Sequence, residues 1–521
     1  MSESTPGVTE KGSRSHGSSD SRALVLQNPL DWFRIFGPGA VIASLTIGAG
    51  ELIFSSRGGA LFGYRLLWFF ALVLLFKWAL VFASTRHIVL TGAHPFQRWM
   101  DLPGPRGWLP LTFFILALPC FPIWVCFHAG TVGTLVSWLA GTEEALHGAA
   151  YLLWGMLLLS IVLFLIFNGG YARLERMQIG ITTLLVFAVV LSLFWLKPDW
   201  VELVKGLLLP QSLQYPAWVS SYPDIAARPV WVETVTYVGI IGGSGYDYLA
   251  YASYIRDKGW GQAGKAVADA RLLKTMAENP AHANRSWVRA CVIDSTLSFL
   301  AVLIFTAVFV ACGTVVLGPQ HKVPTGMNLL PLQAEFVTPI YAWLKWVYFG
   351  GAFLAMFGTL YGTIEVAPTV LRELLAAARP SLQGADLAKS RTWSVLWVGL
   401  GGMVLLVGNF TYALMTEVKT PSGLIALLTP ANLFTGVLAC GIICLLNCWM
   451  DRRFLPPALR MNWLLGSLNL AAGISFLLLG LKGYWDHSGW KSWVMLAGTL
   501  AVGWMGAYWW NRVVGRDDRR N

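Results

Sequence analysis

The sequence predicts an all-α membrane protein with about twelve spanning helices, on the strength of its composition and its repeating apolar runs. Of the 521 residues, 56% are hydrophobic and only 12% are charged, and the mean hydropathy is +0.58. A soluble domain carries about 25% charged residues. Apolar runs long enough to cross a bilayer recur along almost the whole chain. These observations exclude an ordinary soluble enzyme, a disulfide scaffold, a collagen-like chain and a disordered chain.

The two ends of the chain differ from the rest. Residues 1–30 are rich in Ser, Gly and charge and contain no apolar segment, which predicts a disordered cytoplasmic tail and no signal peptide. Residues 31–485 form the predicted membrane domain. Residues 486–521 hold the last predicted span and a short basic cytoplasmic tail.

The apolar runs predict the spans in order, and they are numbered here from one to twelve. Their predicted ranges are 38–62, 66–84, 109–140, 149–167, 177–196, 231–255, 288–317, 341–369, 392–415, 422–449, 462–481 and 491–510.

The orientation of these spans follows from the distribution of Lys and Arg. With the N-terminus inside, 27 of the 38 basic residues fall in cytoplasmic tails and loops, and the loop 256–289 alone holds seven of them. This bias is the positive-inside rule, and it predicts that both termini are cytoplasmic. The net charge of +11 is therefore explained by topology, and no nucleic-acid partner is expected.

Spans one and six share an unusual pattern in which glycines precede a carboxylate. Span one contains the sequence of residues 47–51, which ends at Glu51, and span six contains that of residues 241–247, which ends at Asp247. Glycine weakens a helix by about 1 kcal/mol relative to alanine. Unwound backbone within a membrane is tolerated where protein surrounds it. We therefore expect both spans to be unwound, at 47–51 and 242–247, as in an inverted repeat of five helices.

Glu51 and Asp247 are the leading candidate site residues, since a carboxylate at mid-bilayer costs at least about 2.5 kcal/mol and needs a partner or a cavity. One interpretation is that each pairs with a basic residue such as Lys77. The other is that both face one cavity between the broken spans and bind a cation, with Tyr246 and Tyr248 as oxygen ligands or as packing residues.

Three further polar residues lie within predicted spans. Asp294 and Glu365 could form a second ion site or a proton relay, or could make helix–helix hydrogen bonds. His128 is a candidate proton carrier, although a lone histidine on an apolar helix is more often packed and hydrogen-bonded. The seven cysteines show no CxxC spacing, and no catalytic motif nominates a nucleophile, so neither a cofactor nor an enzyme activity is expected.

Several short motifs resemble those of the Nramp divalent-metal transporters over residues 31–480. The motifs are Gly37-Pro38-Gly39, Phe62-Gly63-Tyr64, Leu66-Leu67-Trp68, Arg173-Leu174-Glu175, Gly239-Ile240-Ile241-Gly242 and Asp451-Arg452-Arg453. The resemblance implies the LeuT-type fold, with inverted repeats at about 31–200 and 228–450. It also implies a metal site between spans one and six.

The chain departs from that family at the metal site itself. The family's first-span motif Asp-Pro-Gly-Asn corresponds to Gly48-Ala49-Gly50-Glu51, and its sixth-span motif Met-Pro-His corresponds to Tyr246-Asp247-Tyr248. The soft thioether ligand is therefore absent from that position, and carboxylate, carbonyl and water ligands suit Mg, Ca and Mn. The third span also lacks the acidic residues of the family's proton path.

The resemblance predicts a secondary transporter of the plasma membrane that moves a divalent cation by alternating access, with protons as a second partner if transport is coupled. Its predicted metal-site residues are Gly48, Glu51, Gly243, Tyr246 and Asp247. One alternative keeps the fold but carries an organic cation or an amino acid in a tyrosine-lined cavity. Another is a membrane sensor that transports nothing. The oligomeric state is not predicted.

Overall fold

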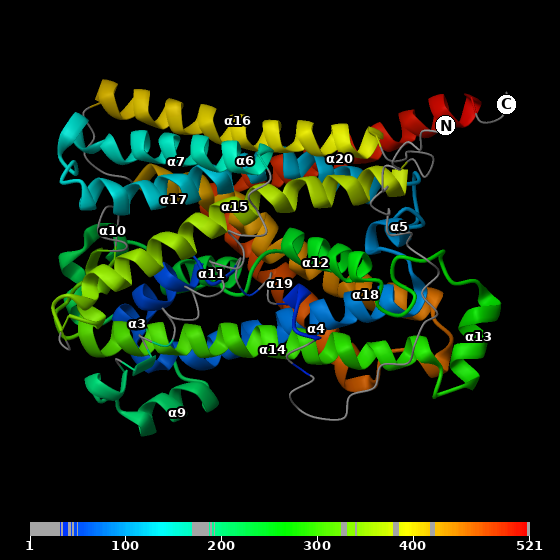
Figure 1. Ribbon diagram of the computed structural model, residues 1–521, viewed down its shortest axis with the longest axis horizontal. Helices are drawn as coiled ribbons and strands as arrows, with labels where there is room; N and C mark the ends of the chain where they lie inside the picture. Colours follow the sequence, from blue (N-terminus) through cyan, green and yellow to red (C-terminus); the bar gives the residue numbers. More distant parts are fainter. Residues whose placement is uncertain are drawn as a thin grey trace, which may run out of the picture.

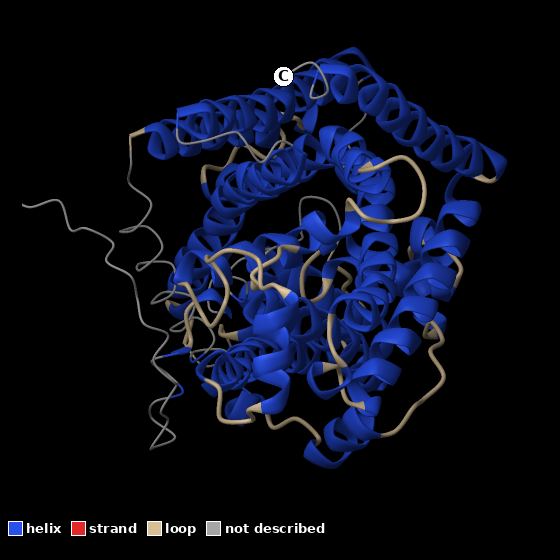
Figure 2. Cartoon of the chain, turned by 90° about the vertical axis from the view of Figure 1, so that its right-hand side faces the viewer, coloured by secondary structure: helices blue, strands red, loops and turns tan. Residues whose placement is uncertain are grey.

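The computed structural model is helical throughout the part of the chain that it describes, and Figure 2 shows helices and loops with no strand there. The described residues are 50–168, 193–324, 331–338, 341–378, 385–416 and 422–517, with isolated residues between 32 and 48 and between 187 and 191. Within them, eight helical segments are long and apolar enough to cross a membrane. The predicted fold class is confirmed. The predicted tail 1–30 and most of span five lie outside the described residues.

The first group of helices corresponds to predicted spans one to four. Its elements are η1 (Gly50–Ser55), α3 (Ser56–Phe62), η2 (Gly63–Leu66), α4 (Leu67–Thr91), α5 (Pro95–Trp99), α6 (Trp108–Leu139), η3 (Ala145–Gly148) and α7 (Ala150–Phe167). Helix α4 extends about two turns beyond the predicted end of span two and ends where Gly92 takes a left-handed conformation (φ 73°).

The second group corresponds to the loop after span five and to spans six and seven. Its elements are α9 (Trp200–Leu208), η4 (Ala217–Ser221), α10 (Pro223–Ala226), α11 (Val230–Ile240), α12 (Gly245–Lys258), α13 (Ala270–Glu278), α14 (Ala283–Cys312), η5 (Gly313–Leu317) and η7 (Pro331–Phe336).

The third group corresponds to spans eight to twelve. Its elements are α15 (Leu344–Ala378), α16 (Ala385–Thr416), α17 (Ser422–Asn432), η8 (Leu433–Leu438), α18 (Ala439–Phe454), η9 (Pro457–Leu459), α19 (Trp463–Ser488) and α20 (Trp490–Asp517). Exposed apolar side chains such as Trp393, Val404 and Met415 mark the face of α16 that suits contact with lipid.

The short helices gather at the two ends of the bundle. Figure 1 shows α3, α9 and α10 at one end and α5 and α13 at the other, where α20 also ends. The loops predicted to be cytoplasmic, which contain α5 and α13, therefore lie together. The end of the bundle that carries α13 is called the α13 end below, and the opposite end is called the α9 end.

Spans one and six are both interrupted, as expected, but over shorter stretches than expected. In span one, Ile47 and Gly48 form a turn before the π-helix η1, which already includes Glu51. In span six, α11 ends at Ile240 and α12 begins at Gly245. Helix α12 begins early because Ser244 and Asp247 form a capping box at its first turn, in which each side chain accepts a hydrogen bond from the other's backbone N–H.

Candidate ion site

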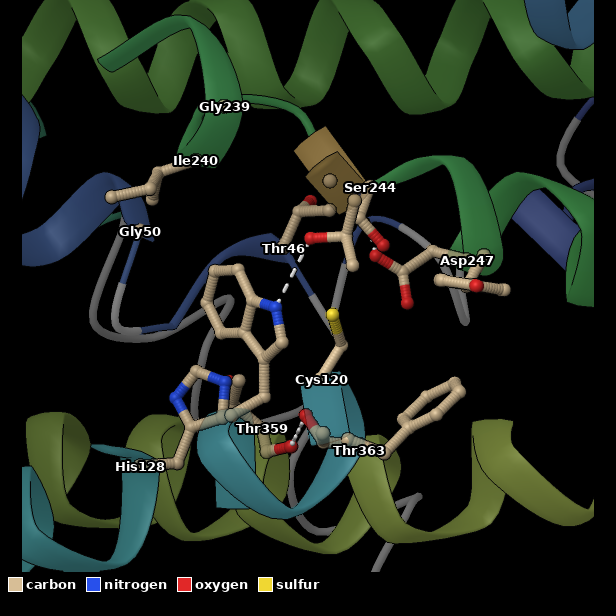
Figure 3. A pocket seen from close by; sticks show the side chains of 15 residues that line it. Thr46, Gly50, Cys120, His128, Gly239, Ile240, Ser244, Asp247, Thr359 and Thr363 are labelled. Carbon is tan, nitrogen blue, oxygen red and sulfur yellow. Dashed lines mark hydrogen bonds between the residues drawn. The ribbon is translucent and has the colours of Figure 1, made fainter. Parts of the chain in front are cut away.

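A cavity of about 60 Å³ lies between the two breaks and is enclosed by five spans. Span three contributes Cys120, Phe121, Trp124 and His128, span eight contributes Thr359 and Thr363, and span ten contributes Thr435. Spans one and six contribute Thr46, Gly50, Gly239, Ile240, Gly243, Ser244, Tyr246 and Asp247. Figure 3 shows Ser244 and Asp247 on one side of the cavity and His128, Thr359 and Thr363 on the opposite side.

Asp247 supplies the carboxylate of this cavity. Its Oδ2 accepts a hydrogen bond of 2.7 Å from the backbone N–H of Ser244, which fixes the side chain at the start of α12. The residue is only partly buried, because it borders the cavity. Asp247 therefore places a negative charge at the cavity wall.

Neutral oxygens complete the polar lining. The hydroxyls of Thr46, Thr359, Thr363 and Thr435 each donate to a backbone carbonyl of their own helix, at 2.8–3.1 Å. A hydroxyl that donates its proton keeps lone pairs for accepting or for binding a cation. No group of three or more His, Cys, Asp or Glu side chains suited to a metal occurs among the described residues. A cation here would therefore depend on Asp247 and neutral oxygens, which favours hard ions.

The break in span six has a side-chain partner for most of its freed backbone groups. Gly242 and Gly243 have φ values of 82° and 96°, which side-chain-bearing residues rarely adopt. The Gly242 N–H donates to Glu51 Oε1 (2.8 Å), and the Gly242 carbonyl accepts from the Tyr248 hydroxyl (2.5 Å). The ammonium of Lys77, on α4, donates to the carbonyls of Ile241 and Gly243, each at 2.7 Å.

Lys77 is completely buried. It makes no direct ion pair with Glu51 or Asp247, and both pairs would lie within the described part of the chain. Its ammonium instead donates to carbonyls of the break that these two acids flank. Lys77 is therefore not the ion-pair partner that one interpretation gave to Glu51 and Asp247.

Glu51 does not share the cavity with Asp247, contrary to expectation. It is fully buried and absent from the cavity wall, since its Oε1 is held by the Gly242 N–H. Its Oε2 has no hydrogen-bond partner among the described residues. Only one of the two carboxylates therefore borders the cavity, an arrangement that span-by-span analysis of the sequence does not reveal.

The remaining predicted ligands, Gly48, Gly243 and Tyr246, lie near the cavity, but other contacts occupy the groups that would bind a metal. The Gly243 carbonyl borders the cavity but is held by Lys77. Tyr246 lines the cavity with its ring, while its hydroxyl donates to the Phe113 carbonyl of span three at 2.5 Å. Gly48 packs so tightly against span eight that an added Cβ would lie 1.7 Å from Thr359 Oγ1. Thr359 thus occupies the space of a side chain at position 48.

Two of the three further candidates serve as helix contacts. Asp294 accepts hydrogen bonds from the backbone N–H groups of Gly37 (3.0 Å) and Gly39 (2.8 Å) and from the Tyr251 hydroxyl. It therefore binds the start of span one to spans six and seven. Glu365 forms an ion pair with Arg391 across α15 and α16 (2.6 Å). Neither residue borders the cavity.

His128 is the exception, because it lies on the cavity wall. Its ring stacks on Trp124 with centroids 5.4 Å apart, and its buried Nδ1 has no hydrogen-bond partner among the described residues. The histidine is therefore placed where a proton or a ligand could reach it, as its candidate role requires.

Polar contacts also join the half-helices at the two ends of the bundle. At the α9 end, Arg57 of α3 forms a buried ion pair with Glu233 of α11 (2.5 Å), and Tyr237 donates to the same carboxylate (2.8 Å). At the α13 end, Arg256 of α12 pairs with Glu373 of α15 (2.6 Å). Span six is thus anchored on both sides of the cavity, to span one at the α9 end and to span eight at the α13 end.

The sequence reasoning missed most of the cavity wall. The four threonines, Cys120 and Trp124 were not predicted, since threonines and aromatic residues occur in many of the spans that do not line the cavity. The one available signal was the spacing of Thr359 and Thr363, which places both hydroxyls on one face of span eight.

Together, the fold and the site define a multi-pass helical membrane protein with a polar cavity between two discontinuous helices, the architecture of secondary transporters. The family model described as natural resistance-associated macrophage protein-like (Nramp) matches residues 39–375. The chain belongs to the Nramp family, and so to a family of metal-ion transporters and not of enzymes. None of the curated protein sequences matches the chain.

Solved structures support the same fold. A manganese transporter of Eremococcus coleocola in complex with an aromatic bis-isothiourea compound is similar with a TM-score of 0.67 at 16% identity, covering 95% of this chain and 98% of that one. A mutant of the same transporter gives a TM-score of 0.66 at 15% identity, with coverage of 95% and 98%. MhsT in complex with L-phenylalanine gives 0.51 at 14% identity, covering 86% of this chain and 98% of that one. The LeuT-type fold is confirmed.

Proposed function

We propose that this protein is a secondary transporter that carries a divalent metal cation through the cavity between spans one and six by alternating access. The observation that carries the proposal is the partly exposed Asp247 carboxylate in a cavity otherwise lined by hydroxyls, carbonyls and rings. Such a site binds a hard divalent ion with some of its water retained. Mn²⁺ and Mg²⁺ are therefore the proposed cargo. The manganese transporters of the same fold are consistent with this choice.

The volume of the cavity argues against the organic-substrate alternative. About 60 Å³ has room for an ion and a few waters, whereas pockets for organic ligands measure about 300 Å³ or more. An aromatic cage would be formed by Tyr246, Tyr248 and Tyr251, but of these only Tyr246 borders the cavity. Tyr248 and Tyr251 donate their hydroxyls to Gly242 and Asp294.

Uptake of Mn²⁺ and Mg²⁺ into proteoliposomes tests the proposal. Asp247→Asn removes the carboxylate of the cavity while keeping its shape, so uptake should fall by at least about tenfold, the factor that corresponds to about 1.4 kcal/mol. Glu365→Gln is the matched control, since Glu365 lies in a span but pairs with Arg391 outside the cavity. If Asp247→Asn takes up both ions at the wild-type rate, the proposed site is wrong.

We further propose that His128 carries the proton if transport is coupled to a pH gradient. Its Nδ1 is the buried nitrogen without a described partner on the cavity wall. A proton shared between Glu51 and Asp247 has less support, because Asp247 borders the cavity whereas Glu51 does not and is held by the Gly242 N–H. His128→Gln should then keep cation uptake while abolishing its acceleration by an inward pH gradient. Cation-driven acidification that persists in His128→Gln would contradict this role.

A further inference from the structure

The ammonium of Lys77 occupies a position in the span-six break that is built for a cation. Its Nζ lies 2.7 Å from the carbonyl oxygens of both Ile241 and Gly243, and the whole side chain is buried. An added Cβ on Gly242 would lie 3.4 Å from Lys77 Cδ, so the stem of the lysine packs against the break itself.

The backbone around this position presents groups that favour a cation. Helix α11 ends at Ile240, and the C-terminal end of a helix carries partial negative charge. Glu51 and Asp247 flank the same break, since they accept hydrogen bonds from the backbone N–H groups of Gly242 and Ser244. A charge buried in a membrane protein without such compensation would be very costly. Two carbonyls at the end of a broken helix, with acids nearby, are also the groups that bind free cations in transporters of this architecture.

We infer that Lys77 is a tethered cation that permanently fills one of two cation positions at the break, so that the cavity holds a single mobile ion at Asp247. This inference rests on the proposed function, since it takes the mobile ion to be a metal cation. Lys77 then determines how many cations the protein binds. Lys77 also lowers the negative charge that the mobile ion meets, because its charge offsets one of the two carboxylates.

Removing the ammonium should open its position to a small free cation. Lys77→Met keeps an unbranched apolar stem that ends where the ammonium begins, and it leaves the Ile241 and Gly243 carbonyls without their donor. Thermal unfolding of the full-length protein in detergent is measured in NaCl and in choline chloride at equal ionic strength. We expect Na⁺ to raise the melting temperature of Lys77→Met, since a ligand that binds only the folded state stabilises it. The wild type and the charge-conserving Lys77→Arg should melt equally in both salts.

A second variant keeps the inference testable if Lys77→Met does not fold. Lys77→Ala lacks three carbons and the ammonium, which n-propylammonium can supply, so this ion should stabilise Lys77→Ala and leave the wild type unaffected. A response to Na⁺ in Lys77→Met or to propylammonium in Lys77→Ala supports the inference. The absence of both overturns it, as does a Na⁺ response of equal size in Lys77→Arg.

These readouts contain no divalent metal, so they separate the two proposals. If the wild type carries no divalent ion, the proposed function fails, whereas a Na⁺ response of Lys77→Met would still identify Lys77 as the occupant of a cation position. The number of ions bound gives a further measurement, and titration calorimetry with Mn²⁺ in NaCl should show one site in the wild type. In Lys77→Met, apparent Mn²⁺ affinity should rise by about tenfold in choline chloride, the factor that corresponds to about 1.4 kcal/mol of lost repulsion.

Discussion

At the scale of single residues, the cavity combines oxygen ligands with one sulfur atom that the sequence analysis did not place there. The sixth-span thioether of the family is replaced by Tyr246, which suggested a site without sulfur. The structure instead brings Cys120 of span three to the wall of the cavity. Its position could not be predicted, because contact between spans three and six depends on packing and not on sequence spacing.

The Cys120 sulfur should decide how the protein treats soft ions. Because the remaining polar lining consists of oxygens and one histidine, we expect tighter binding of Mn²⁺ than of Cd²⁺. Cys120→Ser should weaken Cd²⁺ binding by about tenfold or more and leave Mn²⁺ binding unchanged, as measured by calorimetry. Cys444→Ser is the control, since Cys444 is buried but does not line the cavity. If Cys120→Ser lowers the affinity for Cd²⁺ and for Mn²⁺ by the same factor, the sulfur contributes packing and is not a ligand for Cd²⁺.

Tyr246 gives a complementary prediction. Since its hydroxyl donates to the Phe113 carbonyl, Tyr246→Phe should bind Mn²⁺ as the wild type does, although the unfolding free energy should fall by about 1 kcal/mol for the lost hydrogen bond. Calorimetry and thermal unfolding measure the two quantities separately. A strong loss of Mn²⁺ affinity in Tyr246→Phe would show that the hydroxyl is a metal ligand.

At the scale of elements, the breaks in spans one and six were predictable from their glycines, but their exact extent was not. The side chains that bind the unwound backbone of span six come from distant parts of the sequence, such as Lys77 at Gly243 and Glu51 at Gly242. The half-helices are also joined across the bundle, by Arg57 with Glu233 at the α9 end and by Asp294 with the start of span one at the α13 end. The proposed alternating access would require each of these contacts to open in turn.

Breaking one contact should therefore expose the cavity to one side only. Glu233→Gln leaves the buried Arg57 without its ion-pair partner, a loss of about 3–5 kcal/mol. We expect Cys120 to react faster with a thiol reagent added from the α9 side, as followed by peptide mass spectrometry. Asp294→Asn should produce the same change for reagent added from the α13 side. Acceleration from the same side in both variants would contradict the assignment of the two contacts to opposite ends.

At the scale of the whole molecule, composition and the period of the apolar runs were sufficient for the fold class. Most predicted spans begin within about a turn of a helix start, because a bilayer imposes a crossing of about 20 residues. Several helices, among them α4, α15, α19 and α20, run about two turns or more beyond the predicted ends. The lysine and arginine bias further predicted which loops lie together, and α5 and α13 do gather at one end. The packing of five spans around one cavity could not be predicted, since it depends on side-chain fit between helices that are far apart in the chain.

The predicted orientation has a direct test. Lys205 on α9 and Lys274 on α13 are both exposed and lie at opposite ends of the bundle. In intact cells, Lys205→Cys should react with a membrane-impermeant maleimide, whereas Lys274→Cys should react only after permeabilisation. The reverse pattern would place the α13 end, and with it the end of α20, outside the cell.

The contact between Gly48 and Thr359 has a consequence for how this site could acquire the metal ligand of its relatives. An added Cβ at position 48 would collide with Thr359 Oγ1 at 1.7 Å. Gly48→Asp alone is therefore expected to be inactive, although it restores the acid found in the first-span motif that the sequence resembles. Paired with Thr359→Gly, the same substitution gains space, so the two positions should show strong epistasis in a double-mutant cycle. Positions 48 and 359 therefore determine together whether an acid fits at this point of span one. Conversion of this site to the first-span motif of the family is expected to need both substitutions.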